Sequence, residues 1–210
     1  MITYIIVAII AYLLGSISFS VIISKKMAGF DVRKKGSGNA GTTNVLRSVG
    51  KKAAIITLIL DILKGVVAIL VAYIAGKIVK EIDKSLLIQI AGIAVIIGHT
   101  FPKFFGFKGG KGIATSLGVL LMTNWNIGLI CLVFALVLMA LTRMVSVGSI
   151  IAAILFPILI MFMPSNYYIV EGNYVIYSII LAVLVIYNHR ANVQRLLNGT
   201  ENKLDFKKIK

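Results

Sequence analysis

Residues 33–47, RKKGSGNAGTTNVLR, combine cations, glycines and hydrogen-bonding side chains in a pattern suited to binding an anion. Glycines let backbone N–H groups converge on an anion without interference from a Cβ atom. The glycines are Gly36, Gly38 and Gly41, and the polar side chains are those of Ser37, Asn39, Thr43, Asn44 and Arg47. Arg47 follows Thr43 by four residues, so the two can share a helix face. Phosphate is the ligand that this set fits, and a solvated turn flanked by basic residues is the alternative.

The three glycines also satisfy G-x-G-x-x-G, the pattern of dinucleotide-binding folds. In those folds the pattern follows a strand and opens a helix within a βαβ unit. Here it follows an apolar span and a basic run, and no βαβ pattern is present. A dinucleotide site is therefore disfavoured.

A second glycine-rich stretch, GHTFPKFFGFKGGKGIATS, occupies residues 98–116. Gly109 and Gly110 precede Lys111, and an apolar helix is expected from about Ile113. We expect free N–H groups and the positive end of that helix to face whatever Lys111 faces, which predicts an anion site. A Walker A motif needs Ser or Thr after the lysine, whereas Gly112 follows here, so ATP hydrolysis is not supported.

The third polar stretch, VIYNHRANVQRLLNGTENK, spans residues 185–203. His189, Asn192 and Arg195 recur every three residues, roughly along one helix face just beyond the last apolar run. An interfacial amphipathic anchor accounts for Arg195 and the leucines, but it accounts less well for His189 and Asn192.

Two shorter groups of polar residues lie between these stretches. Arg143, Ser146 and Ser149 are spaced by three at the expected start of a helix. Asp61 and Lys64 lie inside an apolar run at positions i and i+3. Because charges within a membrane are costly, they either pair with each other in the bundle interior or contribute to a site.

The motifs that are missing define the reaction class. There is no H-E-x-x-H, no cysteine–histidine metal pattern and no G-x-S-x-G, and Cys131 is the only cysteine. Neither His99 nor His189 is followed by an aspartate four or five residues on. Cations, N–H groups, hydroxyls and amides bind and neutralise phosphate, and they leave the reactive groups to the substrates.

The elements that position these residues belong to a membrane protein. Of 210 residues, 59% are hydrophobic and the mean hydropathy is +0.99, well above soluble domains. Long unbroken apolar runs favour helices over a barrel. We therefore predict an all-α, polytopic transmembrane bundle that forms one domain, residues 1–210. Its seven spans come from apolar stretches at about 2–23, 53–76, 85–98, 113–124, 127–142, 145–163 and 174–188. The alternative is six spans, in which the fourth and fifth stretches form a single helix.

The basic residues indicate the orientation. With the amino end outside, most of the 22 Lys and Arg residues fall in inner connections and at the carboxyl end, as the positive-inside rule requires. All the polar, glycine-rich connections then lie on the cytoplasmic side. The net charge of +15 is divided among short loops, which suits anionic lipids or substrates and argues against a nucleic-acid partner.

Taken together and in order, the motifs resemble the bacterial acyl-phosphate:glycerol-3-phosphate acyltransferase family over nearly the whole chain. The matching segments are GSISFS (15–20), GSGNAGTTNVLR (36–47), DILKG (61–65), GHTFPKFFGFKGGKGIATS (98–116), TRMVSVGSI (142–150) and NHRANVQRLLNGTENK (188–203).

The resemblance implies an integral enzyme of the bacterial plasma membrane with seven helices, its amino end outside and its site facing the cytoplasm. It would transfer a fatty acyl group from acyl phosphate to the 1-hydroxyl of glycerol 3-phosphate, giving 1-acylglycerol 3-phosphate and phosphate. No acyl-enzyme, cofactor or metal is expected. By the same resemblance, the phosphates would be held by Ser37, Arg47, Lys111, His189 and Asn192, with Thr43 and Ser149 as weaker candidates.

Two other classes of protein fit part of the pattern. A carrier or channel for an anion also places polar groups among helices, but carriers commonly show inverted repeats or helices broken at the membrane midplane. Here the glycine-rich stretches fall at span ends on one side, which favours an enzyme. A structural lipid-binding protein would give no purpose to the glycines or to Asn39, Asn44 and Asn192.

Overall fold

The computed structural model describes residues 1–162 and 174–204, and all regular structure in this part of the chain is helical. The elements are α1 (Ile2–Gly15), α2 (Phe19–Ala28), η1 (Val32–Lys34), α3 (Thr42–Ser48), α4 (Lys51–Ile78), α5 (Lys84–Thr100), η2 (Lys103–Phe105), α6 (Ile113–Thr123), α7 (Trp125–Thr142), α8 (Val145–Phe162), α9 (Tyr174–Asn188) and α10 (Arg190–Leu197). Each of the seven apolar stretches contains a helix, which confirms the all-α class. Residue 163 of the sixth stretch lies outside the described residues.

The helices differ in whether they are long enough to cross a membrane. In the described part of the chain, five helical segments are long and apolar enough, and a sixth is added if α9 and α10, bent by 62°, count as one. Helix α6 has 11 residues. At 1.5 Å per residue it measures about 16 Å, against roughly 30 Å of hydrocarbon. The structure thus supports five or six spans by length.

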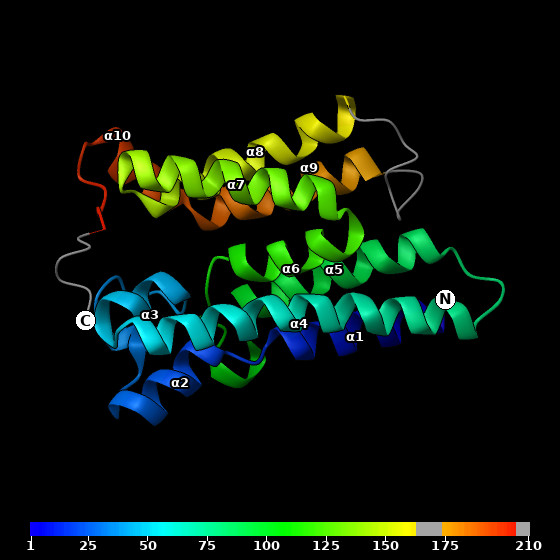
Figure 1. The fold of residues 1–210 in the computed structure, drawn as a ribbon. Coiled ribbons are helices and arrows are strands. Elements are labelled where there is room, and N and C mark those ends of the chain that lie inside the picture. Colours follow the sequence, from blue (N-terminus) through cyan, green and yellow to red (C-terminus); the bar gives the residue numbers. More distant parts are fainter. Residues whose placement is uncertain (163–173, 205–210) are drawn as a thin grey trace.

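Two predicted boundaries are resolved by the structure. The first stretch, 2–23, is interrupted between Gly15 and Phe19, so that α2 leaves the axis of α1 (Figure 1). The fourth and fifth stretches are separate helices joined at Asn124, whose side chain caps α7 by accepting from Ile127 N. A Cβ atom on Gly128 would lie 3.3 Å from Leu121 N, so α7 folds back on α6. The rival single helix is therefore excluded.

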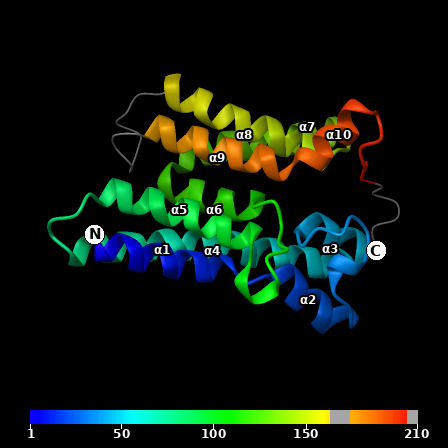
Figure 2. The same cartoon turned by 180° about the vertical axis from the view of Figure 1, so that it is seen from behind.

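Helix direction alternates along the chain and gathers the polar connections at one end of the bundle. Figures 1 and 2 show α2, α3 and α10 at the same end, with the loop between α5 and α6 on the side of the bundle that faces them. The amino terminus and the α4–α5 connection lie at the opposite end. The three polar stretches are therefore brought to a single region.

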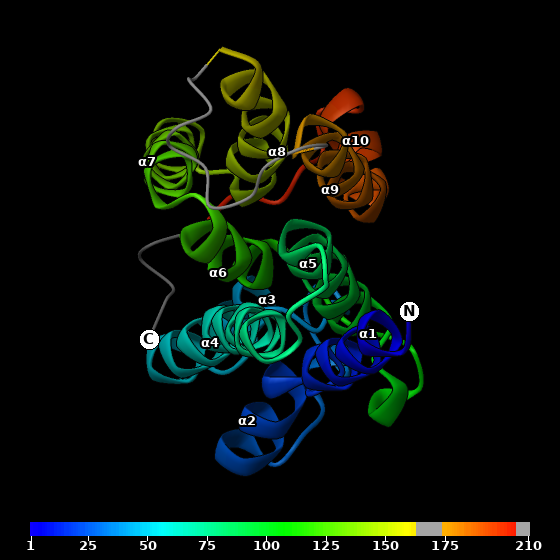
Figure 3. The same cartoon turned by 90° about the vertical axis from the view of Figure 1, so that its right-hand side faces the viewer.

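The helices form two groups, which are seen end-on in Figure 3. Helices α7, α8 and α9 form one group, and α1, α4, α5 and α6 form the other. Glycines allow very close helix crossings within the second group, as is common between membrane helices. A Cβ atom on Gly118 of α6 would lie 2.1 Å from Ile62 O of α4, and one on Gly98 of α5 would lie 2.2 Å from Tyr12 O of α1.

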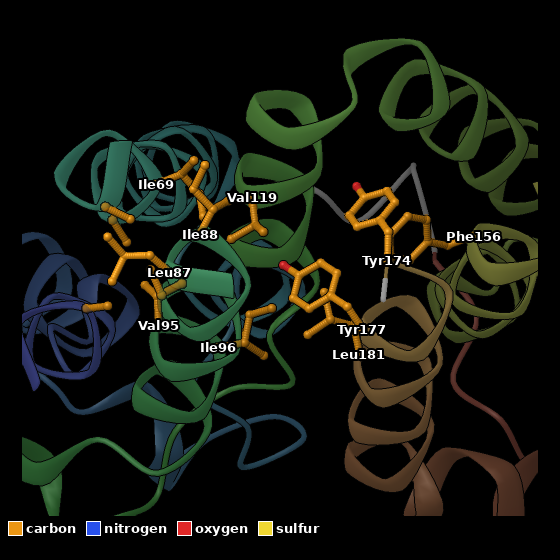
Figure 4. Close-up of a cluster of buried hydrophobic side chains, with 14 of the residues drawn as sticks. Ile69, Leu87, Ile88, Val95, Ile96, Val119, Phe156, Tyr174, Tyr177 and Leu181 are labelled. Carbon is orange, nitrogen blue, oxygen red and sulfur yellow. The ribbon is translucent and has the colours of Figure 1, made fainter. Parts of the chain in front are cut away.

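The hydrophobic core lies between the two groups and within the larger one (Figure 4). Leu87 and Val95 of α5, Val119 of α6 and Tyr177 of α9 are almost fully buried. Many other Ile, Leu and Val side chains on the outer faces of the helices are exposed, as expected where lipid is the solvent.

The close crossing of α1 and α5 generates a prediction about stability. In Gly98→Ala the new methyl group would meet the Tyr12 carbonyl and the backbone of Gly15, neither of which can move as a flexible side chain does. We expect the free energy of unfolding in detergent to fall by about 1–3 kcal/mol. Gly76→Ala is the control, because its nearest neighbour is the flexible Lys84 side chain at 3.1 Å. Equal stability of the two variants would contradict the close packing.

Candidate active site

The first polar stretch forms a loop, residues 35–41, that is organised by Asn44 at the start of α3. The Asn44 side chain is buried and donates from Nδ2 to the carbonyls of Val32 (2.9 Å), Lys35 (3.0 Å) and Asn39 (3.0 Å). Its Oδ1 accepts from Ser37 N at 2.9 Å. The amide of Asn44, predicted to bind phosphate, is thus committed to shaping the loop.

Two glycines give this loop its turn. Gly36 and Gly38 have φ angles of 59° and 71°, which favour glycine. Ser37 between them is exposed, so its hydroxyl is accessible from outside the loop. The other predicted residues of this stretch, Asn39 and Thr43, are partly buried. The loop also contacts the second glycine-rich stretch, because Ala40 N donates to Gly109 O at 3.4 Å.

The second stretch packs tightly against the end of α5. Gly109 N donates to Thr100 O, and Gly110 N donates to His99 O, both at 3.1 Å. A Cβ atom on Gly109 would lie 2.0 Å from His99 O. The sequence predicted free N–H groups here for an anion, whereas those of Gly109 and Gly110 are occupied in the structure. Because Gly109 and Gly110 have no side chain, the segment can lie against α5, and this places Lys111 just before α6.

Lys111 contacts the third stretch through a chain of hydrogen bonds. Its Nζ donates to Asn192 Oδ1, and Asn192 Nδ2 donates to Glu201 Oε1 at 2.8 Å. The same carboxylate accepts from Ser146 Oγ and from Arg195 Nε, each at 2.9 Å. Glu201 therefore joins α8, α10 and the loop before α6 into one polar cluster.

Arg47 lies at the exposed edge of this cluster. One of its terminal guanidinium nitrogens donates to Asn202 O at 3.3 Å. Partial burial lowers the pKa of Arg47 and the nearby Glu201 carboxylate raises it, so the group remains a cation. Most of the guanidinium is left available to an anion.

His189 occupies the bend between α9 and α10 and is buried. Its Nδ1 lies 2.8 Å from Val185 O. Because a carbonyl can only accept, Nδ1 carries the hydrogen in this contact, and Nε2 is the nitrogen left to accept a proton. The preceding Asn188 donates from Nδ2 to Thr100 Oγ1 at 3.1 Å and so holds the bend against the end of α5.

The electrostatics of the cluster favour an added anion. Burial lowers the pKa of Lys111 to about 8, Glu201 opposes this shift, and the positive charges of Arg195 and Arg47 add to it. Burial raises the pKa of Glu201, but the hydrogen bonds from Asn192, Ser146 and Arg195 together lower it by more. The pKa is therefore below its usual value, and the group stays ionised. One carboxylate thus faces three cations, and an anion that joins them would relieve their repulsion.

An apolar cavity begins beside the polar cluster and runs between α6, α7, α8 and α9. Its lining includes Ile113 and Val185 near Lys111 and His189, and Thr123 and Tyr177 at the other end of α6 and α9. Ile113 and Thr123 are ten residues apart on α6, which corresponds to about 15 Å. Ser149 also lines the cavity, with its hydroxyl donating to Val145 O at 2.9 Å.

The structure therefore brings together four of the five residues that the resemblance implies hold the phosphates: Arg47, Lys111, His189 and Asn192. Ser37 lies on the adjoining loop, and Ser149 lies in the cavity wall. Glu201 is not among the predicted residues, and Ser146 is predicted only as part of a spaced group. Their signal was weak, although Glu201 is one of only seven acidic residues and lies near the end of the third stretch. No group of three His, Cys, Asp or Glu residues suited to a metal occurs in residues 1–162 and 174–204.

Comparison with known proteins gives one consistent result. The model of the family described as "Glycerol-3-phosphate acyltransferase" matches residues 5–199. The glycerol-3-phosphate acyltransferase of Clostridioides difficile (strain 630) is 47% identical over 98% of both chains. That of Thermoanaerobacter sp. (strain X514) is 45% identical over 94% of this chain and 93% of its own.

Solved structures agree with these relatives. The crystal structure of PlsY, an integral membrane glycerol 3-phosphate acyltransferase, in its glycerol 3-phosphate form superposes with a TM-score of 0.84. It is 39% identical and covers 98% of each chain. The lysophosphatidic acid form of PlsY gives a TM-score of 0.81 at 37% identity, covering 98% of this chain and 97% of that one.

Proposed function

This chain belongs to the glycerol-3-phosphate acyltransferase family, and we propose that its acyl donor is an acyl phosphate bound around Lys111. The chain is an acyltransferase that converts glycerol 3-phosphate to lysophosphatidic acid. It is an integral, multi-pass membrane protein. We further place it in the bacterial plasma membrane as a single domain, residues 1–210.

One observation carries this proposal, namely that a cationic cluster lies next to one end of an apolar cavity. Lys111 and Ile113, two residues apart, belong to the cluster and to the cavity lining respectively. An acyl phosphate has the matching form, an anionic head on an apolar chain. The cavity would hold the chain by burying apolar surface, and the cluster would hold the phosphate by charge-assisted hydrogen bonds.

The individual roles follow from the chemistry of each group. Arg47 is exposed and suits bidentate phosphate binding. The Lys111 ammonium has three N–H donors and uses one on Asn192, so others can reach a phosphate oxygen. The Ser37 hydroxyl provides a further donor from the adjoining loop. The remaining predicted contacts, Gly36, Gly38, Asn39, Thr43, Asn44, Gly109, Gly110 and Ser149, would shape or flank these groups.

In the reaction, the 1-hydroxyl oxygen of glycerol 3-phosphate bonds to the acyl carbon and the bond from that carbon to the phosphate oxygen breaks. Phosphate leaves with the electron pair. The hydroxyl proton goes either to His189 Nε2 or to a phosphate oxygen of a substrate. Because the acyl phosphate is already activated, the protein contributes orientation and stabilises the charge on the leaving phosphate.

The orientation of the bundle supports access from the cytoplasm. All seven apolar helices alternate in direction, and the basic loops collect at the end that carries the site (Figure 1). From the alternation of the helices we assign seven membrane spans. By the positive-inside rule we assign an external amino end, and a carboxyl end and site on the cytoplasmic side. For α6, the spanning element would be completed by the residues that flank it.

The donor is tested directly with purified protein in detergent. Radiolabelled glycerol 3-phosphate is supplied with palmitoyl phosphate, palmitoyl-CoA or palmitoyl-acyl carrier protein in separate reactions. We expect lysophosphatidic acid from palmitoyl phosphate alone. Product from the thioesters but not from the mixed anhydride would reject the proposed donor and leave the acyltransferase assignment intact.

The phosphate-binding role of the cations predicts the effect of removing them. Arg47→Ala and Lys111→Ala should each lower kcat/KM by at least about 100-fold, the scale for losing a preorganised electrostatic donor. Steady-state kinetics with palmitoyl phosphate measures this. Lys26→Ala is the control, because Lys26 is an exposed cation on α2. Near-normal activity of both Arg47→Ala and Lys111→Ala would contradict their phosphate-binding role.

The lowered pKa of Lys111 predicts a pH dependence. A lysine with a pKa of about 8 is cationic below that pH and loses its charge above it. We expect kcat/KM for glycerol 3-phosphate to be steady up to about pH 8 and then to fall, since this ratio reports ionisation of the free enzyme. In Lys111→Arg any remaining activity should lack this alkaline decline. If Lys111→Arg kept the same alkaline decline in kcat/KM, the decline would belong to a group other than Lys111.

The cavity predicts how chain length affects the rate. Ala153→Phe, on the lining of α8, should lower kcat/KM for palmitoyl phosphate by about 10-fold or more and affect octanoyl phosphate less. Ile154→Phe is the matched control, because the neighbouring Ile154 is 45% exposed on the outer face. Equal losses for both donors in Ala153→Phe would show that the acyl chain lies elsewhere.

A further inference from the structure

Three ionisable side chains that have no proposed contact with the substrate form a buried cluster behind the glycine-rich segment before Lys111. Asp61 and Lys64 of α4 are 1% and 4% exposed, and His99 of α5 is 7% exposed. Lys64 Nζ lies 3.0 Å from Asp61 Oδ1, and His99 Nδ1 lies 3.6 Å from the same oxygen. Burying such groups is costly, and a buried pair is weak evidence of a gain in stability. The cluster therefore calls for a specific role.

Lys64 connects α4 to the break between α1 and α2. Its Nζ donates to Gly15 O and to Ile17 O, each at 2.9 Å. These carbonyls lie where α1 ends, and helix ends leave carbonyls without an intrahelical partner. The Asp61 carboxylate is the third neighbour of the ammonium, as an ion pair at 3.0 Å. The ammonium is thereby fixed, and it fixes the Asp61 carboxylate in turn.

His99 connects this cluster to the glycine-rich segment before Lys111. Its Nδ1 faces Asp61, and its Nε2 lies against Gly110, where an added Cβ atom would be only 2.2 Å away. Its carbonyl accepts from Gly110 N at 3.1 Å. Both the ring and the main chain of His99 therefore contact the residue that precedes Lys111.

We propose that Asp61, Lys64 and His99 form a positioning unit that fixes the Gly109–Lys111 segment and so holds the Lys111 ammonium in place for acyl transfer. The inference rests on the proposed role of Lys111 in binding phosphate. None of the three acts on the substrate directly. Lys64 and Asp61 orient the imidazole, and the imidazole supports the backbone of Gly110.

A double-mutant cycle tests whether His99 acts through Lys111. The variants are His99→Leu, Lys111→Met and the two combined, assayed for kcat/KM with glycerol 3-phosphate and palmitoyl phosphate. We expect His99→Leu to lose on the order of 100-fold, the scale of a misplaced catalytic group. The combined variant should lose no more than about threefold beyond Lys111→Met, because residues that act as one unit are not additive.

Additive losses would overturn the positioning role and leave the proposed function intact. Near-normal activity of Lys111→Met would instead reject the role of Lys111 itself, so the two failures are distinguishable. Asp61→Asn keeps an oxygen near Lys64 but removes the charge that faces His99, and it should show the same non-additivity with Lys111→Met. An additive result for this pair would exclude Asp61 and Lys64 from the unit.

Two further measurements separate positioning from folding. His99→Asn keeps a donor nitrogen near Asp61, and we expect it to regain at least about tenfold of the activity that His99→Leu loses. If His99→Leu does not fold, the cycle is run with His99→Asn and the same criterion. Gln89→Leu, at the other end of α5 and 8% exposed, is the matched control and should keep its activity. Thermal unfolding in detergent is recorded for every variant, and a loss of activity that tracks unfolding temperature across the set would contradict the proposal.

Discussion

The polar end of this bundle depends on the hydrogen bonds that the Glu201 carboxylate accepts. These come from Ser146 on α8 and from Asn192 and Arg195 on α10, and Asn192 contacts Lys111. The chain has 22 basic residues and only seven acidic ones, so a counter-charge for a partly buried group of cations is scarce. One ionised carboxylate allows Arg195, Lys111 and Arg47 to lie near one another and leaves net positive charge for a substrate phosphate. A second carboxylate would compete with the substrate.

The site also lies between two environments, the polar end of the bundle and its apolar interior. Charged groups are costly within the hydrocarbon, so the cations that would meet phosphate lie at the end of the bundle, while the cavity extends between α6, α7, α8 and α9. Lys111 at the start of α6 marks the boundary between these environments. The proposed amphipathic donor would suit this division, because its charged and apolar parts need different surroundings.

Glycine serves close packing in this protein as much as anion binding. Gly109 and Gly110 let their segment lie against His99 and Thr100, and their N–H groups are used there. Gly98 and Gly118 bring α1 against α5 and α4 against α6. The loop of residues 35–41 is likewise shaped by the Asn44 side chain. The glycine-rich stretches thus set where Lys111 and Ser37 lie, and in the proposed function the charged side chains would provide the attraction for phosphate.

The sequence by itself determined the helical class, the helix in each apolar stretch, the gathering of polar connections, and the residue types suited to phosphate. These properties depend on the length of apolar runs and on spacing within a few residues, which local chemistry fixes. Only the tertiary structure decided which groups meet. Lys111 and Asn192 are 81 residues apart, Ser146 and Glu201 are 55 apart, and Arg47 and Asn202 are 155 apart. Glu201 as a shared acceptor, Asn44 as a loop support, the occupied N–H groups of Gly109 and Gly110, and the break after Gly15 all depend on partners from distant helices. No local pattern specifies such partners, because they are set by how the helices pack.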